Sequence, residues 1–147
     1  MIGLIKNKNN NKMITTFLNP FSYIMARSNK DQLSHFNIKI DGGLLVILLN
    51  LFGFKYKRRS FDMTSLAPVV FIDAIKNNKS IYFIGSKPKV IDLAVQNIQL
   101  QFPELNICGY IDGYIIQDQR PVIFDTINSL KADYVICGMG TPLQEQF

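Results

Sequence analysis

The sequence predicts an α/β fold, with a Rossmann-like parallel sheet, flanking helices and a smaller N-terminal α/β part packed on it. Two observations carry this prediction. From residue 80 onward, short apolar segments alternate with segments of helical periodicity, a pattern typical of a parallel sheet covered on both faces. The chain also has 147 residues, 48% of them hydrophobic, which is the size and composition of one globular domain.

In the first half of the chain we expect a flexible lead-in, residues 1–12, followed by a single domain, 13–147. The lead-in contains a polar run of low complexity. Asn19 and Pro20 end the first strand, because a residue before proline avoids the helical region. The expected strands here cover residues 13–18 and 37–40, and the expected helices cover 21–28 and 44–52. The second of these helices is apolar on nearly every side and favours a buried position.

The second half repeats strands and helices. A helix with capping candidates at 60–63 runs to about residue 77, with Pro68 in or near its first turn. The further strands are expected at 81–84, 105–108 and 134–137, and the further helices at 90–102 and 121–130. In such sheets ligands bind at the carboxyl ends of the strands. The loops expected there are 85–88, 109–114 and 138–144.

Charge and cysteine content narrow the class of protein. The net charge is +5, with basic residues gathered at 6–12 and 55–59. Such a charge is compatible with binding to nucleic acid, to an anionic membrane or to a phosphorylated substrate, and equally with a solvated surface that binds nothing. Cys108 and Cys137 lie in apolar stretches and are expected to be buried in a reducing compartment. With His35 the only histidine, no metal site is expected. No apolar run approaches the roughly 20 residues of a membrane span, so the protein is expected to be cytoplasmic.

Glycines follow two of the expected strands. Gly138 and Gly140 lack the third glycine of a dinucleotide fingerprint, since Leu143 stands in its place, and no cofactor is expected. Glycines after a strand let backbone N–H groups approach a phosphate or a sugar. Gly85 and Ser86 follow the same logic, although an ordinary turn from strand to helix explains them equally.

Four polar side chains earlier in the chain also have two interpretations each. Asp41 follows a strand and could cap the next helix, or act as a general base. Arg58 and Arg59 could be solvated, or hold a diphosphate by bidentate contacts. Asn19 could contact a sugar, or form a turn before Pro20.

Taken together, these residues resemble the WecG/TagA/CpsF family of glycosyltransferases almost continuously from residue 81 to 145. The matching pieces are 83–88 (Phe-Ile-Gly-Ser-Lys-Pro), 102–105 (Phe-Pro-Glu-Leu), 112–114 (Asp-Gly-Tyr) and 138–145 (Gly-Met-Gly-Thr-Pro-Leu-Gln-Glu). Upstream, the similar pieces are 16–19, 40–42, and Arg59 with 61–63. The last of the downstream pieces matches the family's Gly-x-Gly-x-Pro-x-Gln-Glu signature and is the most specific.

The resemblance implies an inverting, metal-independent hexosyltransferase of cell-surface polysaccharide or teichoic acid biosynthesis. It would transfer an N-acetylmannosamine-type sugar from a UDP donor to a polyprenyl-diphosphate-linked amino sugar at the inner face of the cell membrane. Asp41 would be the catalytic base and Arg59 would face the diphosphate. The other substrate-binding residues would be Asn19, Gly85, Ser86, Gly113, Tyr114, Gly138, Gly140 and Gln144.

Members of the family continue beyond the Gln-Glu pair, so the chain is expected to be C-terminally incomplete. The missing segment would supply membrane attachment, and peripheral binding would be weak without it. An alternative is a truncated, non-catalytic module that binds a nucleotide sugar or a partner. In either case a homo-oligomer is possible. A nucleic-acid partner would rest on the net charge alone and is not expected.

Overall fold

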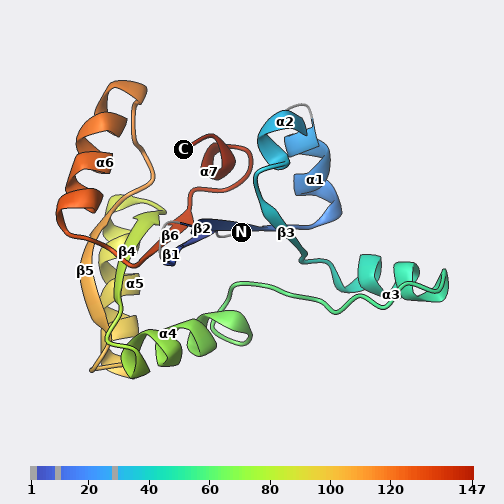
Figure 1. Cartoon of the computed structure of the whole chain (residues 1–147), viewed down its shortest axis with the longest axis horizontal. Helices are drawn as coiled ribbons and strands as arrows, with labels where there is room; N and C mark the ends of the chain where they lie inside the picture. Colours follow the sequence, from blue (N-terminus) through green and yellow to red (C-terminus); the bar gives the residue numbers. More distant parts are fainter. Residues whose placement is uncertain (1–2, 9–10, 28–29) are drawn as a thin grey trace.

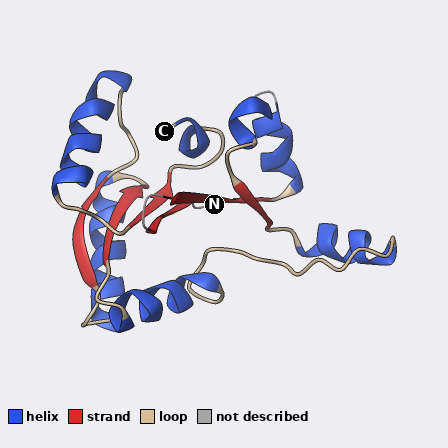
Figure 2. Ribbon diagram, in the orientation of Figure 1, coloured by secondary structure: helices blue, strands red, loops and turns tan. Residues whose placement is uncertain are grey.

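A computed structural model describes residues 3–8, 11–27 and 30–147 of the chain. One six-stranded sheet has the order β3-β2-β1-β6-β4-β5 and carries helices on both faces (Figures 1 and 2). The strands are β1 (Gly3–Lys8), β2 (Asn11–Leu18), β3 (Asn37–Ile40), β4 (Ser80–Gly85), β5 (Asn106–Ile111) and β6 (Tyr134–Gly138). The α/β fold predicted from the sequence is confirmed.

The five predicted helices occur in the predicted order, and the structure adds two short helices that were not predicted. They are α1 (Pro20–Ala26), α2 (Lys30–Leu33), α3 (Gly43–Leu51), α4 (Leu66–Lys76), α5 (Pro88–Gln101), α6 (Arg120–Ser129) and α7 (Leu143–Gln146), with a 3-10 turn at Gln117–Gln119. Helix α4 begins later than the capping candidates at 60–63 predicted, and its N-cap is Ser65. Pro68 lies in its first turn, where a missing N–H costs no hydrogen bond.

Strand β1 differs from the flexible lead-in expected at residues 1–12. It lies inside the sheet and pairs antiparallel with β2 on one side and β6 on the other. The register sets Leu4 opposite both Thr15 and Ile136. The strand was not predicted because the polar composition of residues 6–12 has no strand pattern. Its backbone hydrogen bonds come from two neighbouring strands, and backbone pairing does not require a pattern of side chains. Residues 1–2 and 9–10 of the expected lead-in lie outside the described part.

Alternate residues of the central strands enter two separate cores. Ile81 and Phe83 of β4 pack under α4 and α5, where the ring of Phe71 meets three other phenylalanine rings edge-on at 5.3–6.4 Å. Tyr82 and Ile84 face α6 on the opposite side. Cys137 is buried in this second core, and its burial raises the pKa of the thiol to about 12. Cys108 is half-buried.

Helix α3 was expected to be buried, and this expectation is wrong. Leu44 and Leu51 are 72% and 77% exposed, and of the helix residues only Val46 is buried. Figure 1 shows α3 at the end of an extension that leads away from the sheet. An apolar composition predicts a helix that avoids water, but it does not say what covers the helix.

Strand β2, near the start of the chain, and helix α7, near its end, meet on the face of β2 opposite α4. The Thr16 hydroxyl donates a buried 2.7 Å hydrogen bond to Oε1 of Glu145 in α7. The Gln144 side chain donates to the same oxygen at 2.9 Å. Oε2 of Glu145 is buried and has no hydrogen-bond partner among the described residues.

Strands β4 and β6 approach each other unusually closely at their carboxyl ends. A Cβ atom added to Gly85 would lie 2.4 Å from the backbone oxygen of Gly138, and Gly85 has a φ of +142°. Both features require glycine, because a side chain would meet rigid backbone and strained dihedrals together.

Replacing Gly85 with alanine should therefore lower the free energy of unfolding by at least about 2 kcal/mol. Gly43 is the matched control, since a Cβ there meets nothing within 4 Å; Gly43→Ala should be neutral or stabilise by about 0.5 kcal/mol. Urea denaturation followed by circular dichroism measures both. Equal stability of the two variants would contradict the close approach.

Replacing Thr16 with valine keeps the shape and the strand preference but removes the bond to Glu145. We expect a loss of about 1–3 kcal/mol in unfolding free energy, since a buried acceptor loses a partner. The control is Thr126→Val, at an exposed position of helix α6. The Thr126 hydroxyl bonds to the Val122 carbonyl of its own helix, so this change should alter the unfolding free energy by less than about 0.5 kcal/mol. A Thr16→Val protein as stable as the control would show that the contact contributes nothing.

Candidate functional site

The carboxyl ends of five strands lie along one edge of the sheet. Strands β2, β3, β4, β5 and β6 run parallel to one another, and only β1 runs the other way. The segments that follow these strands contain Asn19, Asp41, Gly85 with Ser86, Gly113 with Tyr114, and 138–144. Every sequence-predicted site residue except Arg59 and Gln144 lies at the end of a strand or within three residues after it, and Gln144 lies in α7.

Three of these segments interlock at the ends of β4, β5 and β6. Ser86 N donates to the Gly138 carbonyl at 3.3 Å, and Gly113 N donates to the Ser86 carbonyl at 2.9 Å. A Cβ on Gly113 would lie 3.0 Å from the Gly85 Cα atom. Ser86 has a φ of +63°, so the turn between β4 and α5 is held in a sharp, left-handed conformation. These residues form the backbone rim predicted from the sequence.

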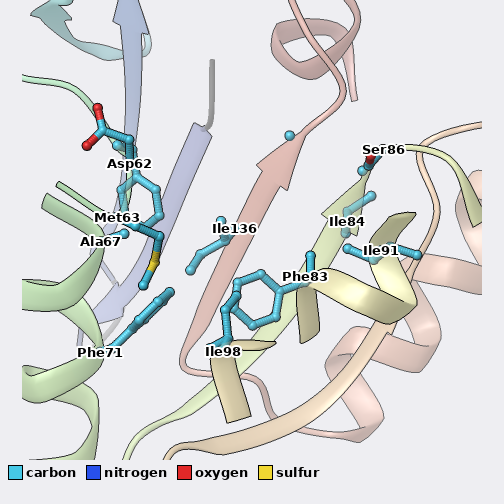
Figure 3. A pocket seen from close by; sticks show the side chains of 14 residues that line it. Asp62, Met63, Ala67, Phe71, Phe83, Ile84, Ser86, Ile91, Ile98 and Ile136 are labelled. Carbon is cyan, nitrogen blue, oxygen red and sulfur yellow. The ribbon is translucent and has the colours of Figure 1, made fainter. Parts of the chain in front are cut away.

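A cavity of about 350 Å³ opens beside this rim, between α4, α5 and the ends of β4 and β6. Phe71, Phe83 and Ile136 line its walls, and Figure 3 shows Asp62 and Ser86 at the same end of the cavity. The lining is mainly apolar with few polar groups, as is typical of small-molecule sites. Helix α5 begins here at Pro88, which has no N–H, and the N–H groups of Val90 and Ile91 both donate to the Lys87 carbonyl at 2.9 Å. The positive end of the helix dipole still favours an anion at this position.

Asp62 is the carboxylate at the cavity rim. It accepts hydrogen bonds from the Ser60 hydroxyl at 2.6 Å, the Thr64 hydroxyl at 2.7 Å and the Thr64 backbone N–H at 2.9 Å. The hydrogen bond from Ser60, then those from Thr64 and the charge of Arg58, hold the pKa of Asp62 below its ordinary value. The carboxylate therefore stays ionised at neutral pH and offers a fixed hydrogen-bond acceptor.

Asp41 lies at the end of β3 and forms an ion pair with Arg58. The Nε and Nη2 atoms of Arg58 both lie 3.2 Å from Oδ1 of Asp41. The arginine side chain is 55% exposed and the aspartate side chain 22% exposed. The charge of Arg58 also contributes to the lowered pKa of Asp62, more weakly than the hydrogen bonds from Ser60 and Thr64. The alternative of Asp41 as a helix cap is not observed, since the N-cap of α3 is Gly42 and has no side-chain bond.

Arg59, predicted to face the substrate, has a different environment from Arg58. Its backbone N–H donates to the Ile40 carbonyl at 2.9 Å. Its side chain lines a second cavity of about 470 Å³ together with Thr15, Lys39 and Asp73. The structure thus brings Arg58, the neighbour of the predicted residue, to Asp41.

The two predicted amide side chains are both held by protein groups. Oδ1 of Asn19 accepts from Ser22 N at 2.9 Å and from its hydroxyl at 2.8 Å, and so caps α1. This agrees with the turn-forming interpretation. Gln144 is only 7% exposed and donates to Glu145, while its Oε1 has no hydrogen-bond partner within the described ranges.

Sequence reasoning missed Asp62 and the pairing of Arg58 with Asp41. The spacing Ser60-x-Asp62-x-Thr64 was a usable signal, because short hydroxyl side chains two positions away bond readily to an aspartate. The ion pair gave no such signal, since it joins residues 17 positions apart. Across the part of the chain that the structure describes, no cluster of three or more His, Cys, Asp or Glu side chains could hold a metal ion.

The fold and the edge loops define a class of protein, an α/β protein whose loops gather at the carboxyl edge of a mainly parallel sheet. The chain matches the glycosyl transferase WecG/TagA/CpsF family over residues 2–147, and it belongs to that family. The resemblance seen in the sequence is thereby confirmed.

Two bacterial proteins illustrate the relationship. One is the UDP-Gal:alpha-D-GlcNAc-diphosphoundecaprenol beta-1,4-galactosyltransferase of Shigella boydii. It is 42% identical over an alignment of 144 residues, which covers 92% of this chain and 59% of that protein. The other is the N-acetylglucosaminyldiphosphoundecaprenol N-acetyl-beta-D-mannosaminyltransferase of Bacillus subtilis (strain 168), 30% identical over 128 residues, 86% of this chain and 49% of that protein. The chain thus spans about half the length of these relatives.

Replacing Ser60 with alanine should raise the pKa of Asp62 toward its ordinary value of 3.8, because the largest cause of the lowered pKa is the Ser60 hydroxyl. NMR titration of the carboxyl carbon measures the change. Ser129→Ala is the control, since that hydroxyl bonds to the Thr126 carbonyl on α6 and should leave the pKa of Asp62 where it is. An unchanged titration of Asp62 in Ser60→Ala would refute the assigned cause.

Proposed function

We propose that this chain carries the donor and acceptor sites of a hexosyltransferase. It would move a sugar from a UDP donor to a polyprenyl-diphosphate-linked amino sugar, in cell-surface polysaccharide or teichoic acid biosynthesis. The observation that carries the proposal is the Asp41–Arg58 pair at the sheet edge, next to a glycine-rimmed cavity, in a chain of this family. Because the chain covers 59% and 49% of the two relatives, whole-enzyme activity is part of the proposal.

The cavity beside β4 and β6 is our proposed place for the donor nucleotide. Its apolar walls suit a planar base, and the ionised Asp62 can accept a hydrogen bond from a base N–H or a ribose hydroxyl. The backbone at Gly85, Ser86 and Gly138 would lie along the diphosphate, with the positive end of the α5 dipole favouring its negative charge. Gly140, Gly113 and Tyr114 stand on the same edge and would complete this side.

Asp41 is our proposed catalytic base. In an inverting transfer the acceptor hydroxyl attacks the anomeric carbon, its proton passes to a carboxylate, and the bond to the UDP oxygen breaks on the opposite face of the sugar. The ion pair with Arg58 orients the Asp41 carboxylate. The half-exposed guanidinium of Arg58 can stabilise the departing diphosphate without a metal ion. Arg59, Asn19 and Gln144 remain proposed substrate contacts, which requires their side chains to turn from their present partners.

The donor sugar is the least constrained part of the proposal. The resemblance implied an N-acetylmannosamine-type sugar, and the Bacillus subtilis relative is named for that sugar. The relative at 42% identity is named for galactose. Both names share an N-acetylglucosaminyl-diphosphoundecaprenol acceptor, so the acceptor is the firmer proposal. Such a lipid-linked acceptor would place the protein peripherally at the inner face of the cell membrane.

Asp41→Asn should lower kcat by about 10²–10⁴-fold while the affinity for UDP changes by less than about threefold. The assay follows label transfer from UDP-galactose and from UDP-N-acetylmannosamine to a short-chain N-acetylglucosaminyl-diphospholipid, and calorimetry measures UDP binding. The control is Asp92→Asn, an exposed carboxylate on α5, which should keep full turnover.

An Asp41→Asn protein that keeps more than a tenth of the activity would remove Asp41 from the chemistry. If the unaltered chain binds UDP and transfers neither sugar, the chain is the non-catalytic nucleotide-sugar-binding module considered above, and the proposed activity fails.

A further inference from the structure

Helix α3 and the segment that returns from it form an extension that we call the α3 arm, residues 43–58. In Figure 1 it reaches away from the sheet between β3 and α4, and both of its connections lie on the same side. The arm begins two residues after Asp41, and Arg58, which pairs with Asp41, ends it. Its base is therefore part of the proposed site, while its tip is remote.

The arm exposes large apolar side chains that packing inside this domain does not use. The exposed apolar side chains of the arm are Leu44, Ile47, Leu48, Leu51, Phe52, Phe54 and Tyr56. The most exposed of them is Phe52, with 81% of its surface accessible. Isolated exposed apolar residues are normal on a protein surface, but a contiguous group marks a contact surface.

Cations gather at the same extension. From residue 42 to residue 61 the chain has four basic residues, Lys55, Lys57, Arg58 and Arg59, and no Asp or Glu. Lys55 and Lys57 alternate with Phe54 and Tyr56, so the returning segment carries both aromatic and basic side chains. This combination is typical of segments that lie in the headgroup layer of a membrane.

The arm is an ordered hairpin. The Asn50 side chain donates to the Tyr56 carbonyl at 3.0 Å and accepts from the Tyr56 N–H at 2.9 Å. Phe54 stacks on Tyr56 with ring centroids 5.8 Å apart. The basic returning segment is thereby fixed against the apolar helix, and both would meet the same surface.

We propose that the α3 arm docks on the surface of an anionic lipid bilayer. The nine residues of α3 rise about 13 Å, less than half of the roughly 30 Å hydrocarbon thickness, and no helix among the described residues is long and apolar enough to span a membrane. A short helix that is apolar nearly all round, with lysines and aromatics beside it, fits the boundary between headgroups and acyl chains. Anionic headgroups complement Lys55 and Lys57, whereas Arg58 is paired with Asp41.

A second copy of the chain fits the arm less well. A two-fold contact would set the arm against itself and bring Lys55 and Lys57 close to the same lysines of the partner, with no acidic side chain on the arm to offset them. Docking on lipid also explains the position of the arm, on the condition that the proposed function holds. Because the arm starts next to Asp41, its binding to the membrane would hold the catalytic edge of the sheet close to a lipid-linked diphosphate.

Co-sedimentation of the chain with vesicles tests the proposal. The vesicles are pure phosphatidylcholine or mixed phosphatidylcholine and phosphatidylglycerol, without nucleotide or acceptor. The unaltered chain should bind the mixed vesicles at least about tenfold more strongly, and high salt should remove most of the difference. Lys55→Gln with Lys57→Gln should lower the partition coefficient for mixed vesicles about tenfold. Leu44→Ser, Leu51→Ser and Phe52→Ser together should lower it for both kinds of vesicle.

The matched control is Leu100→Ser with Val122→Ser, two apolar side chains that are equally exposed on α5 and α6; it should bind vesicles like the unaltered chain. Circular dichroism establishes that each variant is folded. The proposal is overturned if the unaltered chain ignores lipid charge or binds no vesicles, or if the arm variants bind normally. It is also overturned if size-exclusion chromatography shows that those variants lose only a dimer.

Parallel measurements separate this inference from the proposed function. UDP affinity, and turnover of a water-soluble short-chain acceptor, should stay unchanged in the arm variants. Turnover without vesicle binding would sink the membrane arm and leave the transferase standing. Vesicle binding that depends on the arm, in a chain that neither binds UDP nor transfers sugar, would support the arm and refute the function.

Discussion

The position of strand β1 is the constraint on which the rest of the structure depends. It runs antiparallel to both of its neighbours, β2 and β6. Two strands that are each antiparallel to the same central strand must be parallel to one another, so β2 and β3 end at the same edge as β4, β5 and β6. Without β1, the strand before Asp41 and the glycine turns after β4 and β6 would belong to two separate sheets. The backbone pairing of a polar segment thus assembles the site.

At that edge, one guanidinium acts on two carboxylates, through an ion pair with the first and through its charge on the second. Arg58 contacts Asp41 at the end of β3 and lowers the pKa of Asp62 at the rim of the cavity. Glycine at 85 allows the backbones of β4 and β6 to approach closely, so the rim is built from main chain. A carboxylate, a cation and a backbone rim are what a metal-free displacement of a diphosphate requires. The same Arg58 ends the α3 arm, which ties the proposed membrane contact to the proposed catalytic base.

Much of this architecture was accessible from local patterns. The strand at residues 37–40 and helices α5 and α6 were predicted to within two residues, because their apolar spacing and their proline or glycine boundaries are local signals. The edge loops followed from the general behaviour of parallel sheets. The burial of α3 was mispredicted because exposure is set by what lies around a helix. Asp62 was overlooked because its importance comes from a cavity built by two distant helices.

By itself, the sequence determined the α/β class, the order of most elements, and the family through the Gly-x-Gly-Thr-Pro-x-Gln-Glu segment at 138–145. These are properties of periodicity and of short motifs, and each is written within about fifteen neighbouring residues. Only the tertiary structure decided that residues 3–8 form a central strand and that Arg58 is the arginine at Asp41. It also decided that α3 projects from the fold. Those outcomes depend on pairing and packing between residues far apart in the chain, where the free energy belongs to the contact and not to either segment alone.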